Sequence, residues 1–214
     1  MKVAFLIDGG FLRKKWKEAF EQNLTPENTE KFVKAALAFL GITSADYRAY
    51  FYDCRPCNKK TCLPVSKKEF SFDGTPQFRD GNALLDGIAS LDYFAVREGQ
   101  IMFSGWTLKE RCYNQQPHTD ASFMPSLSQK GVDMKIGLDV AWISYEKTFD
   151  RIVLVTADSD FVPAIKVARR GGIFVHLLTL NHGVLKSLSK NADVTRSEPL
   201  AQIMPDFSAP MRTK

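Results

Sequence analysis

The sequence contains no long hydrophobic run. No uninterrupted apolar stretch approaches the roughly 18 residues that a membrane-spanning helix needs. The apolar part of the N-terminal stretch KVAFLIDGG is too short for the core of a signal peptide, and no small-residue cleavage site follows it. Internal repeats and low-complexity segments are also absent. We therefore expect a cytoplasmic protein without a membrane segment, and its 214 residues suit one globular domain.

Cysteine and histidine are scarce. The four cysteines are Cys54, Cys57, Cys62 and Cys112, and there are three histidines. A disulfide framework is not expected in a cytoplasmic protein, and a C-x2-C pair needs further ligands to hold zinc. His118 and Cys112 are remote in sequence but are the candidates to complete such a site in space. Reduced loop thiols are the simpler interpretation, so zinc binding by Cys54, Cys57 and Cys62 is left open.

Charge of one sign is not in large excess either. The formal net charge is +5 and the sequence pI is near 9.0. This mild excess is compatible with a polyanionic partner, but an ordinary surplus of lysine is the simpler explanation.

Apolar and amphipathic stretches alternate along the chain. Apolar runs predict buried strands at 3–7, 151–157 and 173–180, and an aromatic stretch predicts another at 46–53. Helical patterns are found at 11–20, 25–41, 81–94, 131–147, 159–172 and 182–193. In the second of these helices, Thr25 is the expected N-cap, Pro26 the first helical residue and Gly41 the terminator. In the fourth, Met134, Leu138, Ala141 and Tyr145 share one face.

Strands that alternate with helices predict a doubly wound α/β sheet. A hairpin is expected at 94–106 with Gly99 in its turn, between the irregular stretch 53–80 and a polar loop at 113–130. We therefore predict one domain over 1–196 with an insertion at about 53–130. The proline-containing segment 197–214 is expected to be a surface tail.

Acidic residues follow the predicted strands at the points where the strands end. Asp8 ends the first strand, Asp158 and Asp160 follow the strand at 151–157, and Asp133 opens a helix. In an open α/β sheet, ligands bind beyond the carboxyl ends of the strands, where the strand order reverses. If the two strands are neighbours, these carboxylates converge on one crevice. Carboxylate oxygens suit Mg²⁺ or Mn²⁺, which can activate water against a phosphodiester.

Each acid also has a purely structural explanation. Asp8 and Asp133 are suited to cap helices, and one member of the Asp158 and Asp160 pair is expected to do so. Only the joint arrangement favours function. Asp139 is a second-tier candidate, because it lies about 240° around the helix from Asp133 and four residues after Lys135, a spacing suited to an ion pair.

Three motifs together resemble a known family. FLIDGG, KGVDMKIGLD and VLVTADSDFVPAIKVARRGGIFV are similar to segments of the NYN domain family of PIN-like ribonucleases, in its bacterial LabA-like branch. The resemblance implies a PIN-like three-layer α/β/α fold with a central, mostly parallel sheet. It also implies metal-dependent cleavage of RNA with Mg²⁺ or Mn²⁺.

The resemblance assigns the catalytic and metal-binding roles to Asp8, Asp133, Asp158 and Asp160. Asp139 matches a further acid that recurs in the family's K-G-V-D segment. Thr156 matches a small polar position that is expected to orient a metal-bound water.

One position departs from the family pattern, which usually has asparagine three residues after the first aspartate. Here that position is Phe11. The alternative to a ribonuclease is therefore a catalytically weak or inactive RNA-binding or regulatory module. A phosphatase that uses DSD as a D-x-D motif ranks last, because IDGG lacks the second acid.

RNA is the expected partner, and its phosphates need positive groups near the acids. Lys130, just before the GVD motif, and Arg13, just after the first strand, are the predicted substrate-binding residues. Phe11, Phe161 and Trp106 are considered as base-stacking groups, although Phe161 is expected in the core. A homodimer is left open.

Overall fold

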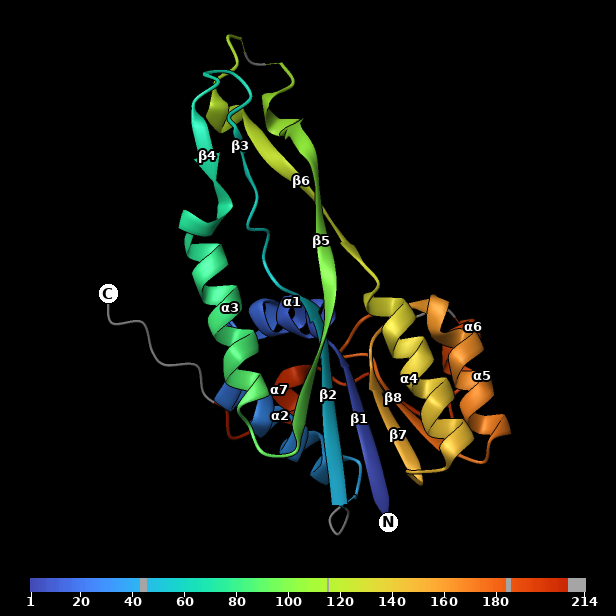
Figure 1. The fold of residues 1–214 in the computed structure, drawn as a ribbon. Helices are drawn as coiled ribbons and strands as arrows, with labels where there is room; N and C mark the ends of the chain where they lie inside the picture. The colour runs from blue at the N-terminus through green and yellow to red at the C-terminus, as the bar shows by residue number, and fades with distance from the viewer. Residues whose placement is uncertain (43–45, 115, 184–185, 208–214) are drawn as a thin grey trace.

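A seven-stranded sheet forms the middle layer of the protein (Figure 1). The computed structural model describes residues 1–42, 46–114, 116–183 and 186–207. The sheet has the order β6-β5-β2-β1-β7-β8-β9. Its strands are β1 (Lys2–Asp8), β2 (Asp46–Cys54), β5 (Phe94–Leu108), β6 (Phe123–Lys130), β7 (Arg151–Val155), β8 (Phe174–Leu178) and β9 (Val194–Arg196). Every neighbouring pair is parallel except β5 and β6, which confirms the predicted mostly parallel α/β fold.

Helices cover both faces of the sheet. One core packs against α1 (Gly9–Phe20), α2 (Pro26–Phe39), α3 (Pro76–Ala89) and α7 (Leu200–Ile203). The other packs against α4 (Val132–Glu146), α5 (Val162–Arg170) and α6 (Lys186–Ser189). Successive residues of β1 alternate between the two, with Phe5 in the first core and Leu6 in the second. The run VAFLI is apolar throughout because both faces of its strand are buried. None of the described helices is long and apolar enough to cross a bilayer.

Helix α2 begins and ends as its sequence predicts. The Thr25 hydroxyl accepts a hydrogen bond from the Asn28 N–H at 3.2 Å, and Pro26 is the first helical residue. Gly41, one residue after the C-cap, has a φ of +70°.

Strand β5 corrects the predicted hairpin at 94–106. Gly99 does not lie in a turn: it pairs with Cys54 at the end of the parallel register between β5 and β2. The strand continues to Leu108 because its outer half pairs with β6, so 123–130 is a strand and not a loop. The short strands β3 (Lys60–Cys62) and β4 (Glu69–Ser71) form a separate antiparallel pair.

Together, the outer half of β5, β6, β3 and β4 project beyond the sheet; we call this projection the arm (Figure 1). The aromatic rings of Phe70, Phe72, Phe103 and Trp106 pack against one another there. The Trp106 indole N–H donates to the Cys62 carbonyl at 2.9 Å. Trp106 therefore has a structural use within the arm.

All four cysteines have free thiols, with Cys54 and Cys112 buried. Among the described residues, no set of three histidine, cysteine or acidic side chains is grouped to hold a metal. The structure therefore gives no support to the zinc interpretation.

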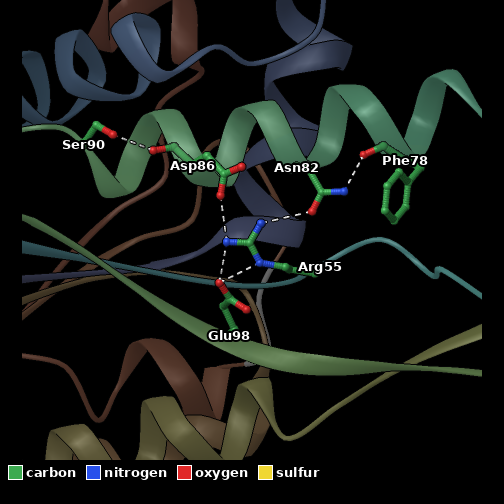
Figure 2. Close-up of polar contacts among 6 residues, drawn as sticks. All are labelled: Arg55, Phe78, Asn82, Asp86, Ser90 and Glu98. Atoms are coloured by element: carbon green, nitrogen blue, oxygen red, sulfur yellow. Dashed lines mark hydrogen bonds and ion pairs between the residues drawn. The ribbon is translucent and has the colours of Figure 1, made fainter. Parts of the chain in front are cut away.

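The segment expected as an insertion is divided between the arm and the main core. Leu85 and Ile88 of α3 are buried in the first core. Arg55 fixes this helix to the sheet: its guanidinium bonds Asn82 at 3.0 Å and Asp86 at 2.8 Å on α3, and Glu98 at 2.9 Å on β5 (Figure 2). Helix α3 and the first half of β5 thus belong to the domain itself.

The C-terminal segment is not a simple surface tail. Leu200, Ile203 and Met204 are buried against the first core, and the Phe207 ring packs on Trp16 with centroids 4.9 Å apart. The apolar side chains that follow Pro199 cover α1 and α2, which a composition rich in proline did not reveal. Residues 208–214 of the expected tail lie outside the described part of the chain.

Helix α4 buries a different face from the one that its large apolar residues mark. Met134, Leu138, Trp142 and Tyr145 are all more than half exposed, at 72, 62, 62 and 83%. Its buried residues are Val132, Ile136, Val140, Ile143 and Ser144. Because both sides of this helix carry apolar residues, periodicity alone did not identify the side that meets the sheet.

Candidate active site at the carboxyl ends of the strands

The strand order reverses between β1 and β7. The chain leaves β1 toward β2 and β5 on one side and later returns to place β7 on the other side of β1. Such a switch point leaves a crevice at the carboxyl ends of the two strands. Asp8 is the last residue of β1, and Asp158 comes three residues after β7 ends. These two acids therefore flank the position where an α/β sheet binds its ligands.

Asp8 caps a helix, and its surroundings disfavour its ionised form. Its Oδ1 accepts a hydrogen bond from the Phe11 N–H at 3.0 Å, which caps α1. Burial raises its pKa from 3.8 to about 6, against the lowering effect of that hydrogen bond. The charges of Asp133, Asp53 and Asp158 raise the pKa further. The local environment of Asp8 thus calls for a positive charge.

Gly9 allows α1 to begin directly after Asp8. A Cβ at this position would lie 2.6 Å from the Phe51 ring and 2.8 Å from the Tyr52 carbonyl oxygen. Only glycine lets the helix approach β2 this closely, so the IDGG motif has a packing function as well as an acid.

Asp133 reaches the same region from helix α4. It lies in the first turn, whose N-cap is Gly131 with a φ of +82° and no capping side chain. The expectation that Asp133 caps this helix is therefore wrong. Partial desolvation raises the pKa of Asp133, and the charges of Asp158 and Asp160 raise it further. Electrostatic coupling thus links Asp133 to Asp8 on one side and to Asp158 and Asp160 on the other.

The acidic pair after β7 is organised by local hydrogen bonds. Asp158 Oδ1 accepts from the Asp160 N–H at 2.9 Å and caps the 3-10 turn Ser159–Phe161 that leads into α5. The expected cap of α5 itself is wrong, because its N-cap is Phe161 and no side chain caps it. Thr156 is fully buried, and its hydroxyl oxygen accepts from the Asp158 N–H at 3.2 Å. Thr156 therefore shapes the turn that presents Asp158. Both aspartate side chains lie at the surface.

Sequence reasoning missed a further acid, Asp53, near the carboxyl end of β2. Its side chain is fully buried. It accepts hydrogen bonds from Arg13 at 3.0 Å, from Gln129 at 3.1 Å and from the Cys54 N–H at 2.7 Å. The rule that singled out Asp8, an acid at the end of a predicted strand, applies equally to Asp53. The sequence pattern instead placed Asp53 as the first residue of the irregular segment 53–80.

The root of the arm also reaches this region. Gln129 of β6 lies beside Gly10, where a Cβ would be 3.4 Å from the Gln129 Oε1 and 3.5 Å from the Asp8 Oδ1. Lys130 is exposed at the end of β6, one residue before Gly131. The two predicted substrate-binding residues therefore differ: Lys130 is exposed, whereas Arg13 is paired with Asp53 and is 45% exposed.

Asp139 is not brought together with the other acids. It accepts a hydrogen bond from the Tyr52 hydroxyl at 2.7 Å and pairs with Arg97 at 3.2 Å. Lys135 instead donates to the Glu98 carbonyl at 2.6 Å. Burial and the Asp139 charge raise the pKa of Tyr52, which keeps its hydroxyl protonated as a donor.

The structure also shows where Phe161 and Phe11, the other candidates for base stacking, lie. Phe161 is buried in the second core, as expected. Phe11 is partly buried against the first core, and its ring meets that of His182 edge-on at 5.9 Å.

The acids fit a hard divalent cation by their chemistry. They offer carboxylate oxygens, and the pKa values of Asp8 and Asp133 are raised first by burial and then by the charges of neighbouring acids. As they stand, no three of these side chains in the described part of the chain are grouped closely enough to hold an ion. The arrangement is therefore a set of coupled acids at one sheet edge and not a finished ligand shell.

Comparison with known proteins identifies a family segment. The NYN domain family model matches residues 100–198, from within β5 to just beyond β9. This segment contains Asp133, Asp158 and Asp160, whereas Asp8 and Asp53 precede it. NYN domains are PIN-like, and the family points to a nuclease or another function related to RNA.

Two individual relatives are less informative. An uncharacterized protein of Methanocaldococcus jannaschii is 32% identical over 122 residues, which cover 53% of this chain and 50% of the relative. The chain thus spans about half the length of this relative. A crystal structure of a protein of unknown function from Vibrio parahaemolyticus has 17% identity and a TM-score of 0.49, with 91% of this chain and 90% of that chain covered. At this level the structural likeness carries no functional argument.

Proposed function

Because the chain carries an NYN domain, we propose that it is a divalent-metal-dependent ribonuclease that hydrolyses phosphodiester bonds of RNA. The observation that carries the proposal is the coupling of Asp8, Asp133 and Asp158, three acids from separate segments, at the sheet's switch point. Among the described residues, none of these three carboxylates forms an ion pair, so a cation would compensate their charge, and the family match gives the cation a use. A cytoplasmic location is part of this proposal.

The proposed ligands of the cation are Asp8, Asp133, Asp158 and Asp160. A bound Mg²⁺ or Mn²⁺ would supply Lewis acidity and lower the pKa of a coordinated water. Asp8 is held in place by its hydrogen bond with the Phe11 N–H, and Asp158 by its bond with the Asp160 N–H.

Substrate binding is assigned to cations around these acids. Arg13 is held by its ion pair with the buried Asp53, near the carboxyl end of β2, and Lys130 is exposed at the end of β6. Both can bind phosphate oxygens. Thr156 fixes the Asp158 turn through a hydrogen bond and is proposed to act by position only. Asp139 is proposed to support the site indirectly through Tyr52.

The test is cleavage of a labelled single-stranded RNA by purified protein with Mg²⁺ or Mn²⁺. EDTA should abolish cleavage, and Asp158→Asn should reduce it strongly while leaving the fold intact. Asp92→Asn is the matched control, because Asp92 is an exposed acid on the loop before β5. Isothermal titration with Mn²⁺ gives a readout that does not depend on turnover. Equal cleavage by wild type and Asp158→Asn would show that the site is wrong.

A second candidate is an RNA-binding module with little or no catalytic activity. It is favoured by the ungrouped state of the acids in the described residues and by Phe11, whose ring packs against the core where the family has an amide. Calorimetry separates the two candidates. Tight RNA binding without measurable Mn²⁺ binding would favour the second.

A further inference from the structure

A second hollow lies at the opposite end of the sheet from the acids. Its volume is about 710 Å³, and it opens between α4 and the amino-terminal halves of β1 and β2. Arg48 and Tyr50 of β2 lie on its floor, and Trp142 of α4 forms a wall. Arg48 and Asp53 are five residues apart on one strand, so the hollow and the acids are roughly 16 Å apart.

Aromatic side chains dominate the lining. They are Tyr47, Tyr50, Tyr93, Trp142 and Phe149. Trp142 is 62% exposed and Tyr93 is 67% exposed, which is unusual for such large apolar groups. Tyr47 and Tyr93 contact each other with ring centroids 5.8 Å apart. The Tyr47 ring packs against the first core, and the Arg97 guanidinium lies over the Tyr50 ring at 5.2 Å from its centroid. The exposed Trp142 is therefore the ring best placed for a flat ligand, because stacking on an aromatic face is favourable for every nucleobase.

The charges of the hollow favour an anion. Arg97 and Asp139 both line it, but they neutralise each other through an ion pair of 3.2 Å. Among the described residues, the Arg48 guanidinium and the Lys2 ammonium have no acidic partner within ion-pair distance. Asp46 also lines the hollow and lies opposite Lys2 in the register of β1 and β2, so the lining carries three cations and two carboxylates. The excess of one positive charge, with Arg48 outside any ion pair, makes the hollow complementary to a planar group that carries a phosphate.

We propose that this hollow binds a ribonucleotide unit, with its base against Trp142 and its phosphate at Arg48. The unit has two possible sources: a free nucleotide, or a nucleotide of an RNA strand that also reaches the acids. The second source rests on the proposed ribonuclease function, whereas binding itself does not. The hollow shares none of the four acids proposed as metal ligands.

The test is a fluorescence titration of the Asp158→Asn protein in EDTA, so that cleavage plays no part. The ligands are AMP, adenosine, inorganic phosphate and oligoadenylates of increasing length. AMP should quench tryptophan fluorescence and bind more tightly than adenosine or phosphate alone. Trp142→Phe should remove the quenching. This result would assign the quenching to Trp142 and not to either of the other two tryptophans. Arg48→Glu should weaken AMP binding by about tenfold, the equivalent of about 1.4 kcal/mol.

The matched control is Lys166→Glu, the same charge reversal at an exposed position on α5. Affinity that rises with oligonucleotide length, and a KM for long RNA that rises in Arg48→Glu without a change for short RNA, would identify the RNA strand as the source. AMP binding with no gain from length would identify a free nucleotide. No quenching by any ligand, or equal weakening by Lys166→Glu, would overturn the proposal. Inactivity of the wild-type enzyme on RNA would leave this titration unaffected.

Discussion

The two ends of the sheet carry opposite chemistry on the same strands. At the carboxyl end, acids from β1, β2, α4 and the turn after β7 gather, and the pKa values of Asp8 and Asp133 are raised. At the amino end, the hollow beside α4 is lined by aromatic rings and by Arg48 and Lys2. We propose that the first end binds a cation and that the second binds an anion.

This difference suggests separate roles: catalysis at the acids and ligand binding at the aromatic hollow. The acids are held by backbone hydrogen bonds and burial, which fix their positions but leave their charges unfavourable. The aromatic end has an exposed tryptophan and an excess of one positive charge in its lining, and the proposal is that it binds a ligand without reacting with it. A substitution should therefore affect turnover at one end and affinity at the other.

The largest expected effect is the loss of cleavage on neutralising an acid at the carboxyl end. Asp133→Asn should lower kcat by more than the roughly 10–100-fold that residues around a metal's ligands usually cost. Trp142→Ala, at the other end, should leave kcat on a short RNA unchanged. Single-turnover kinetics on both variants check this contrast. Equal losses in kcat would remove the distinction between the two ends.

The next effect is a gain in stability from Asp8→Asn in the metal-free protein. Below pH 3.8 the carboxyl is neutral in both the folded and unfolded chains, and above about pH 6 it is ionised in both. Ionisation thus costs the folded state stability as pH rises through this window, by at most about 3 kcal/mol. Asparagine keeps the cap. Urea unfolding should show the gain at pH 7.5 and little gain at pH 3.5; a loss at pH 7.5 would contradict it.

Arg13→Ala should destabilise the protein by about 1–3 kcal/mol at neutral pH, because it leaves the buried Asp53 carboxylate without its cation. Asp53→Asn should cost less, since it removes the buried charge and leaves Arg13 solvated. Chemical denaturation of the two variants gives the comparison. A larger cost for Asp53→Asn would mean that the carboxylate itself, through Gln129 and the Cys54 N–H, supports the fold.

The smallest effect concerns the salt dependence of RNA binding. If Arg48 contacts one phosphate, Arg48→Gln should make RNA affinity less sensitive to salt. The magnitude of the slope of log affinity against log salt concentration should fall by about one. Lys166→Gln on α5 is the control and should leave the slope unchanged. Filter binding with the Asp158→Asn protein over a range of salt concentrations gives both values. Identical slopes for wild type and Arg48→Gln would remove Arg48 from the RNA path.

The sequence predicted what short-range patterns determine. The run VAFLI and the run at 151–155 identified buried parallel strands, and the acids that follow them, Asp8 and Asp158, do lie at one switch point. The cap at Thr25 was equally local, and the structure confirms it.

Long-range strand pairing accounts for most of the differences between the fold expected from the sequence and the structure. The outer half of β5 is a strand because β6 pairs with it across a polar connection, so neither stretch signals the other. The same pairing brings Gln129 to Asp53, which no local pattern predicts. The burial of Leu200 and Ile203 likewise depends on a surface of α1 and α2 that exists only after folding.

The position of β1 has a practical consequence for anyone who trims this chain. Residues 100–198, which the NYN family model matches, include β7 but not the central strand β1 that it pairs with. An excised fragment would expose the unpaired backbone of β7, an edge that promotes aggregation. It would also lack Leu200 and Ile203. The stretch recognised by similarity is thus shorter than the unit that folds, and expression should start from β1 and extend through Phe207.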